Sequence, residues 1–158
     1  MKYFLFTIIF LAALIGCSHD GAVTGPSSEP TSSTSGVKNN ILYTFSVSKD
    51  ILGISDTLSM ELTALNQSST VDTLYSGSNS FTWSLTNSSG EVILSGPKIF
   101  NNLIIRVIIT PHQSAVLIML EYSMAGIFGE TIQTGFYHLQ CNINNGLSLE
   151  LNLLCVGS

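Results

Sequence analysis

The sequence predicts an all-β fold made of antiparallel strands, and three observations support this prediction. Apolar residues alternate with polar ones in short segments, clearest at 41–47, 58–64 and 81–85, as expected for strands that bury one face. Turn-forming residues follow at regular intervals: Asn66-Gln67-Ser68, Asn87-Ser88-Ser89-Gly90, Ser95-Gly96-Pro97, Thr110-Pro111-His112 and Asn145-Gly146. After residue 16, no long window carries the apolar stripe of a helix. These features are typical of a β-sandwich or a β-barrel.

The first 16 residues have the composition of a bacterial export signal. Lys2 is followed by an almost purely apolar run, which is too short to span a bilayer of roughly 30 Å hydrocarbon as a stable helix. The run ends in Leu14-Ile15-Gly16-Cys17, which resembles the lipobox of bacterial lipoproteins. The resemblance implies cleavage between Gly16 and Cys17, acylation of Cys17, and a domain anchored to a membrane of the cell envelope outside the cytoplasm. An ordinary signal peptide with a coincidental cysteine is the alternative.

The composition divides the chain into three parts. Residues 1–16 are the predicted signal peptide, and residues 17–40 are rich in Ser, Thr, Gly and Pro, which predicts a flexible tether behind the lipidated cysteine. The third part, residues 41–158, is long enough for one sandwich domain.

The charge balance excludes a nucleic-acid partner. The chain has 5 basic and 10 acidic residues, for a net charge of −5, and no cluster of Lys and Arg that could neutralise phosphates. Only 9% of the residues are charged, so Ser, Thr and Asn must cover most of the surface.

The last two strands are expected to form a hairpin that keeps Cys141 and Cys155 apart. Segments 137–143 and 147–155 both alternate, and Asn144-Asn145-Gly146 forms the turn between them. A three-residue loop places Cys141 opposite Leu149 and Cys155 opposite Gly135, about 20 Å apart along the ladder. A disulfide needs Cα atoms within about 7 Å, so two buried thiols are expected and a disulfide is the less favoured outcome.

Two predicted strands, 103–109 and 115–120, are apolar on both faces. The favoured interpretation is that they are central strands, with one face in the core and the other partly covered by loops. The alternative is an exposed apolar patch that meets a partner or a membrane.

Several motifs in residues 56–144 resemble the BsuPI-type proteinase inhibitor family in order and spacing. They are Leu62-Thr63-Ala64-Leu65-Asn66-Gln67-Ser68, the block Thr73-Leu74 to Val92, Ile109-Thr110-Pro111-His112-Gln113, and Gly135-Phe136-Tyr137. His112 stands where the family has a turn glycine. The resemblance implies an immunoglobulin-like β-sandwich, with Trp83, Gly135 and Tyr137 in structural positions, and it suggests proteinase inhibition as an activity. Gly135 and Tyr137 also fit a tyrosine corner, in which the phenol bonds to nearby backbone.

The sequence offers no catalytic or metal-binding constellation, so a non-enzymatic protein without cofactors is expected. His19 lies in the tether, His112 in a turn and His138 on a strand, where it is expected to point outward. No nucleophile elbow, zinc-ligand spacing or calcium loop is present.

The candidate partner contact is the segment 123–130, because Met124, Ile127 and Phe128 lie there between glycines. Met and aromatic residues are enriched in interface cores. The alternative, slightly favoured, is that Ile127 and Phe128 fold back to cap one end of the sandwich. The predicted function is a membrane-anchored, exported lipoprotein that binds a protein partner, which could be a protease. Proteinase inhibition and a structural envelope role, with assembly through the apolar strands, are the alternatives.

Overall fold

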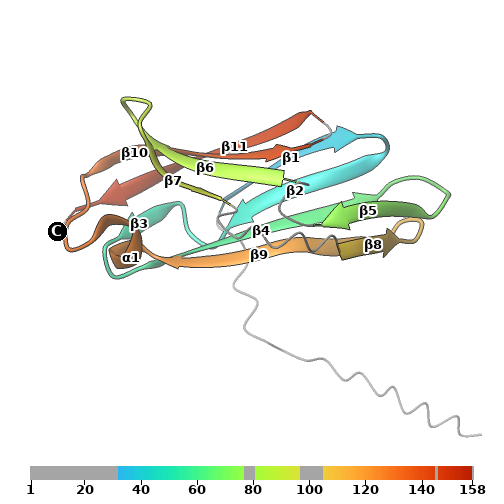
Figure 1. The fold of residues 1–158 in the computed structure, drawn as a ribbon, viewed down its shortest axis with the longest axis horizontal. Coiled ribbons are helices and arrows are strands. Elements are labelled where there is room, and N and C mark those ends of the chain that lie inside the picture. Colours follow the sequence, from blue (N-terminus) through green and yellow to red (C-terminus); the bar gives the residue numbers. More distant parts are fainter. Residues whose placement is uncertain (1–31, 77–80, 97–104, 145, 158) are drawn as a thin grey trace, which may run out of the picture.

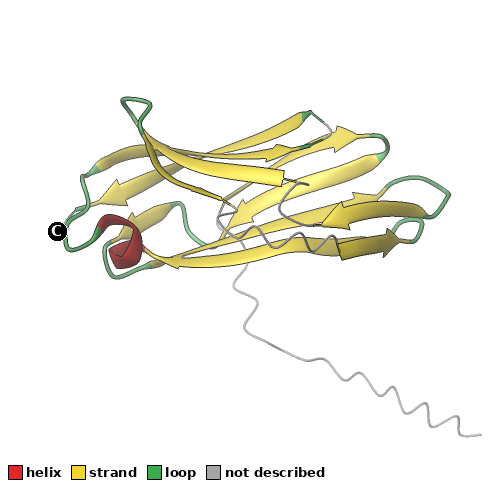
Figure 2. Cartoon of the chain, in the orientation of Figure 1, coloured by secondary structure: helices red, strands yellow, loops and turns green. Residues whose placement is uncertain are grey.

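The chain folds into two β-sheets packed face to face, with a small two-stranded ribbon at one end (Figure 1). The computed structural model describes residues 32–76, 81–96, 105–144 and 146–157. The strands of this part are β1 (Ser32–Lys38), β2 (Ile41–Val47), β3 (Ile51–Gly53), β4 (Thr57–Asn66), β5 (Asp72–Ser76), β6 (Phe81–Asn87), β7 (Val92–Gly96), β8 (Ile105–Ile109), β9 (Ser114–Ser123), β10 (Gly135–Ile143) and β11 (Leu147–Val156). Its helix is the short α1 (Met124–Phe128) (Figure 2). The predicted all-β sandwich is confirmed.

Strand order defines the two layers. The four-stranded sheet has the order β1-β2-β4-β9, and the five-stranded sheet has the order β3-β11-β10-β6-β7. Neighbouring strands are antiparallel, except that β3 runs parallel to the end of β11. Strands β5 and β8 pair only with each other in the described residues, and we call them the β5–β8 ribbon.

The period-two pattern of the sequence determines which face of each strand enters the core. Along β4, every second side chain from Leu58 to Asn66 is buried. Leu85 on β6 and Leu139 on β10 are paired neighbours, and both side chains are fully buried in the core. Removing these apolar faces from water is the main favourable contribution to folding.

The sandwich begins at Ser32, which corrects the predicted boundary at Ile41. Strand β1 pairs with β2 along its whole length, from Ser32 opposite Val47 to Lys38 opposite Ile41. The tether predicted for 17–40 is therefore wrong over Ser32–Lys38, and residues 17–31 lie outside the described residues. A Ser- and Thr-rich strand lacks an apolar period, yet it forms here because β2 supplies a complete ladder of backbone partners.

Gly36 allows β1 to pack closely on the other sheet. A Cβ added at this position would lie 2.8 Å from Leu147 Cδ1 and 3.2 Å from Leu149 Cδ2. The glycine therefore brings the edge of the four-stranded sheet against the start of β11.

The C-terminal hairpin has the predicted register. Cys141 is opposite Leu149 and Cys155 is opposite Gly135, and both cysteines are buried free thiols. Residue 145, the centre of the predicted turn, lies outside the described residues.

Candidate functional site

The segment 123–130 folds back onto the sandwich, as in the favoured alternative of the sequence analysis. Ser123 caps α1, because its Oγ accepts a hydrogen bond from the Gly126 N–H at 3.3 Å. Met124 is fully buried and cannot meet a partner in this conformation, which corrects its assignment as a contact residue. Ile127 and Phe128 are partly buried and pack against the core. Whether this segment folds back depends on the residues that it packs against in the folded chain, and the local sequence does not show these neighbours.

Phe128 and Tyr137 connect α1 to the five-stranded sheet. Their rings meet edge to face, with centroids 5.3 Å apart and an angle of 79° between the planes. The Tyr137 hydroxyl donates to the Gln133 carbonyl at 3.2 Å, which is the backbone hydrogen bond predicted for a tyrosine corner. Burial raises the pKa of Tyr137. Gly135 is the first residue of β10, so both residues of the motif serve the fold.

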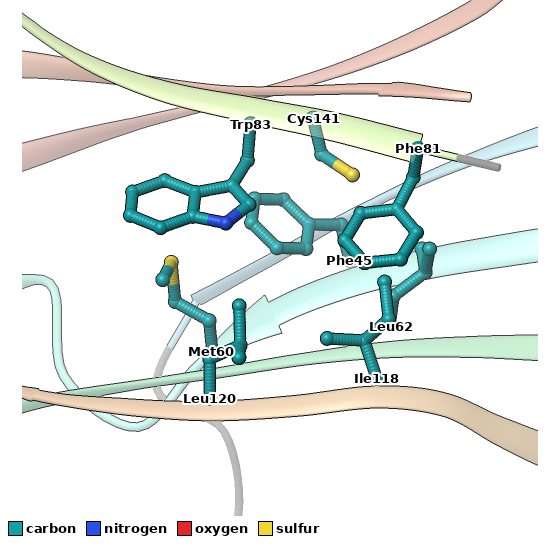
Figure 3. Close-up of a pocket in the computed structure, with 8 residues that line it drawn as sticks. All are labelled: Phe45, Met60, Leu62, Phe81, Trp83, Ile118, Leu120 and Cys141. Atoms are coloured by element: carbon teal, nitrogen blue, oxygen red, sulfur yellow. The ribbon is translucent and has the colours of Figure 1, made fainter. Parts of the chain in front are cut away.

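Trp83 lies in the core beside a small internal cavity. Its ring is tilted against Tyr122 of β9, with the centroids 5.1 Å apart. The cavity has a volume of about 10 Å³, enough for about one water molecule. It is lined by side chains from both sheets: Phe45, Met60, Leu62, Phe81, Trp83, Ile118, Leu120 and Cys141 (Figure 3). This cavity is a gap in the packing between the sheets, and its size does not suit a small-molecule substrate.

The two core cysteines are not poised as nucleophiles. Burial raises the pKa of Cys141 to about 12 and the pKa of Cys155 to about 11. Both thiols therefore keep their protons at neutral pH, whereas the reactive form of cysteine is the thiolate.

The histidines of the domain occupy surface positions. His138 points outward as predicted, with its Nδ1 3.0 Å from Asn152 Oδ1 and its Nε2 3.3 Å from Glu150 Oε2. His112 has a positive φ of 59°, so its turn has the left-handed geometry that glycine adopts most readily. Within the described ranges, no three His, Cys, Asp or Glu side chains gather into a metal-binding group.

The same ranges contain no helix with the length and apolar character needed to cross a bilayer.

Asn66 determines the position of the β5–β8 ribbon relative to the sandwich. Its side chain is fully buried at the end of β4, and its Nδ2 donates to the carbonyls of Thr70 at 2.7 Å and Ile109 at 3.0 Å. Its Oδ1 accepts hydrogen bonds from the N–H and Oγ of Ser68. The Asn66 backbone also pairs with the turn before β9, accepting from the His112 N–H at 2.8 Å. One residue thereby fixes both loops that lead to the ribbon.

The outer face of the β5–β8 ribbon carries large exposed side chains. Thr73 is opposite Ile108 and Tyr75 is opposite Arg106, so these four residues share one face. Tyr75 is 58% exposed and Ile108 is 57% exposed, while Leu74 and Val107 on the other face pack against the core. Arg106 is also exposed. Sequence reasoning did not single out Thr73 or Tyr75, and only the less favoured patch interpretation of the run 103–109 pointed to this surface.

The predicted apolar strands 103–109 and 115–120 have some side chains in the core, as expected for central strands, and others exposed, as expected for an apolar patch. Ile109 is buried in the core, whereas Ile108, Val116 and Met119 are each more than half exposed. These three side chains have the exposure that the patch interpretation requires. Residues 103 and 104 lie outside the described residues.

Comparisons with known proteins identify no family for this chain. No family model matches the sequence, and no curated protein matches it. Among solved structures, a mutant β-glucosidase from Listeria innocua in complex with laminaribiose matches with a TM-score of 0.48 and 11% identity, over 78% of this chain and 16% of that one. The β-glucosidase EmGH1 from Erythrobacter marinus matches with a TM-score of 0.45 and 13% identity, over 79% of this chain and 15% of that one.

A third match has a length similar to that of this chain. The CARDB domain of PF1109 from Pyrococcus furiosus aligns with a TM-score of 0.41 and 11% identity, over 74% of this chain and 94% of that domain. The chain thus spans about one sixth of the glucosidases it matches, and none of these similarities carries a functional inference. The resemblance to the BsuPI-type inhibitors stays a prediction.

Proposed function

We propose that this protein is an exported, lipid-anchored binding module that holds a protein partner through the β5–β8 ribbon. The anchor is Cys17, in the lipobox-like sequence Leu14-Ile15-Gly16-Cys17. The module is the β-sandwich that begins at Ser32.

The observation that carries the proposal is the composition of the ribbon's exposed face. Tyr and Arg are the residue types that most often dominate the energetics of protein interfaces, and here Tyr75 and Arg106 are cross-strand neighbours. Ile108 adds exposed apolar area on the same face. The hydrogen bonds of the buried Asn66 side chain hold the ribbon in place on the sandwich. A ribbon held in place in this way loses less conformational entropy when it binds a partner.

The position of the ribbon suits display from a membrane. The ribbon lies at the end of the sandwich opposite the C-terminus and α1 (Figure 1). The strand at Ser32 leaves residues 18–31 as the spacer behind Cys17, with a root-mean-square span of about 20 Å for a flexible chain. The spacer keeps the domain near the lipid surface, and the ribbon is free to meet a neighbour in the envelope.

The test is site-specific photo-crosslinking in the native envelope, on the full chain. A photoreactive residue replaces Tyr75 in one variant and Val92 in the control, since Val92 is 57% exposed on the five-stranded sheet. The expected result is one discrete crosslinked protein from position 75 and none from position 92. The partner should also be lost from the double variant Tyr75→Ser, Ile108→Ser.

A matched double variant controls for a general loss of surface apolarity. Val92→Ser with Val116→Ser removes side chains that are 57% and 52% exposed elsewhere on the domain, and it should keep the crosslink formed from position 75. Equal crosslinking from positions 75 and 92 would refute the ribbon as the contact. A protease as the crosslinked species would favour the inhibitor alternative, and slowed hydrolysis in the presence of the purified chain would then establish inhibition.

A further inference from the structure

The outer face of the five-stranded sheet has an apolar row at one end. Phe136 on β10 is paired with Leu154 on β11, and Leu154 is paired with Ile51 on β3. Val156 is two residues beyond Leu154 on the same face. Phe136 is 66% exposed, Ile51 57% and Val156 43%. We call Ile51, Phe136, Leu154 and Val156 the Phe136 row.

Apart from the exposed Val92 on β7, the described strands of this sheet face carry mainly polar side chains beyond the row, which makes the row a distinct feature. The next row along the strands includes Thr86, His138 and Asn152, and the row after it includes Ser84, Gln140 and Glu150. Gln140 Nε2 donates to Glu150 Oε1 at 2.9 Å, so the polar side chains satisfy one another. Side chains of the Phe136 row can lose contact with water only by meeting something outside the described residues.

The N-terminal end of the described chain is linked to this row through the end of β2 and the short connection to β3. Ser32, the first described residue, is paired with Val47, and Ile51 follows Val47 by only four residues. The Asp50 carbonyl accepts from the Leu154 N–H at 2.7 Å, which joins this stretch directly to the row. The described chain therefore begins beside Val47 on the four-stranded sheet, four residues before Ile51 of the row on the other sheet.

We infer that the Phe136 row rests on the membrane to which the chain is tethered. This inference depends on the proposed anchor: a spacer of about 20 Å holds a domain with a radius of gyration of about 14 Å against the lipid surface. The face that meets the lipid is then the one that carries the Phe136 row. The row itself contains no basic residue, and Lys49 near it is paired with Asp56 at 2.6 Å. Contact with the lipid is therefore apolar and does not require anionic headgroups.

The inference also orients the molecule. With the Phe136 row on the lipid, the β5–β8 ribbon lies at the other end of the sandwich from the membrane contact (Figure 1). The two exposed apolar surfaces then have separate roles, one in seating the domain and the other in meeting a partner.

The experiment places a tryptophan in the row and asks whether it enters lipid. Residues 18–158 carry an N-terminal hexahistidine in place of Cys17 and are held on phosphatidylcholine vesicles by a nickel-chelating lipid. Phe136→Trp is compared with Met119→Trp, because Met119 is 64% exposed on the outer face of the four-stranded sheet and matches Phe136 in exposure. Trp83 is 3% exposed and adds the same background to both variants. For Phe136→Trp only, attachment to the vesicles should shift the added tryptophan emission to the blue. Brominated acyl chains should quench most of that added emission.

Each outcome decides the question. Equal quenching of the two variants, or no quenching of either, would overturn the inference. That result does not depend on whether Cys17 is acylated in cells, because the histidine tag replaces the lipid anchor in this experiment. Loss of acyl-chain incorporation in full-length Cys17→Ser tests the anchor separately. A concentration-dependent blue shift of Phe136→Trp without vesicles would mean that a second copy covers the row, which would also overturn the membrane contact.

Discussion

Truncating Phe128 should destabilise the domain, since this side chain closes the end of the sandwich. Complete removal of a core phenylalanine costs about 3–5 kcal/mol, and Phe128 is only partly buried. We expect Phe128→Ala to cost about 2 kcal/mol, of which about 1 kcal/mol is the edge-to-face contact with Tyr137. For a domain of this size that corresponds to a fall in Tm of about 8 °C.

The matched control is Phe136→Ala, in which the same atoms are removed from a side chain that is 66% exposed. Its cost should stay within about 0.5 kcal/mol. Phe128→Leu keeps the apolar volume without the aromatic contact and should lose about 1 kcal/mol. Urea unfolding followed by circular dichroism, with a common slope for all variants, measures these differences. If Phe128→Ala were as stable as Phe136→Ala, the segment 123–130 would not be part of the core, and a partner-contact role for Phe128 would be revived.

Three further predictions concern other buried features. Asn66→Ala should cost about 2–3 kcal/mol, because it leaves the buried Ile109 carbonyl without its hydrogen bond, and hydrogen exchange should accelerate in the β5–β8 ribbon. Gly96→Ala should cost about 1–3 kcal/mol, because its Cβ would collide with Trp83 Nε1 and lie 2.6 Å from Trp83 Cε2. Gly135→Ala meets nothing within 4 Å and should be neutral, so equal Tm values for the two variants would contradict this packing. Burial raises the pKa of Cys141 from 9.0 to about 12, so the native thiol keeps a proton that the unfolded chain loses. The Cys141 thiol should therefore lower stability by about 1.4 kcal/mol per pH unit between pH 9 and 12, Cys155 should add a similar slope up to about pH 11, and Cys141→Ala should remove only the Cys141 share in urea titrations.

The C-terminal hairpin could be predicted to the residue because its determinants are local. The Asn- and Gly-containing turn sets the loop length, and the alternation on both sides leaves one register that buries Leu139, Cys141 and Leu151 together. The unpaired state of Cys141 and Cys155 followed from that register.

Features that depend on tertiary neighbours could not be predicted in the same way. Strand β1 contains mainly Ser, Thr and Gly, and it is stabilised by backbone pairing with β2 and by the close approach of Gly36 to Leu147. Likewise, Met124 is buried because the chain between β9 and β10 turns inward, and nothing in its own segment distinguishes this from an exposed loop. The exposed face of the β5–β8 ribbon depends on Asn66, which is distant in sequence from Ile108.

Strand β1 also has a mechanical consequence for an anchored domain. In the proposed arrangement, with a lipid at Cys17 and a partner on the β5–β8 ribbon, tension would enter the described fold at Ser32 and run roughly along the strands. The backbone hydrogen bonds between β1 and β2 are perpendicular to that direction, so all seven residue pairs from Ser32 to Lys38 share the load in shear instead of opening one at a time. In that arrangement, strand β1 transmits mechanical load between the proposed tether and the core.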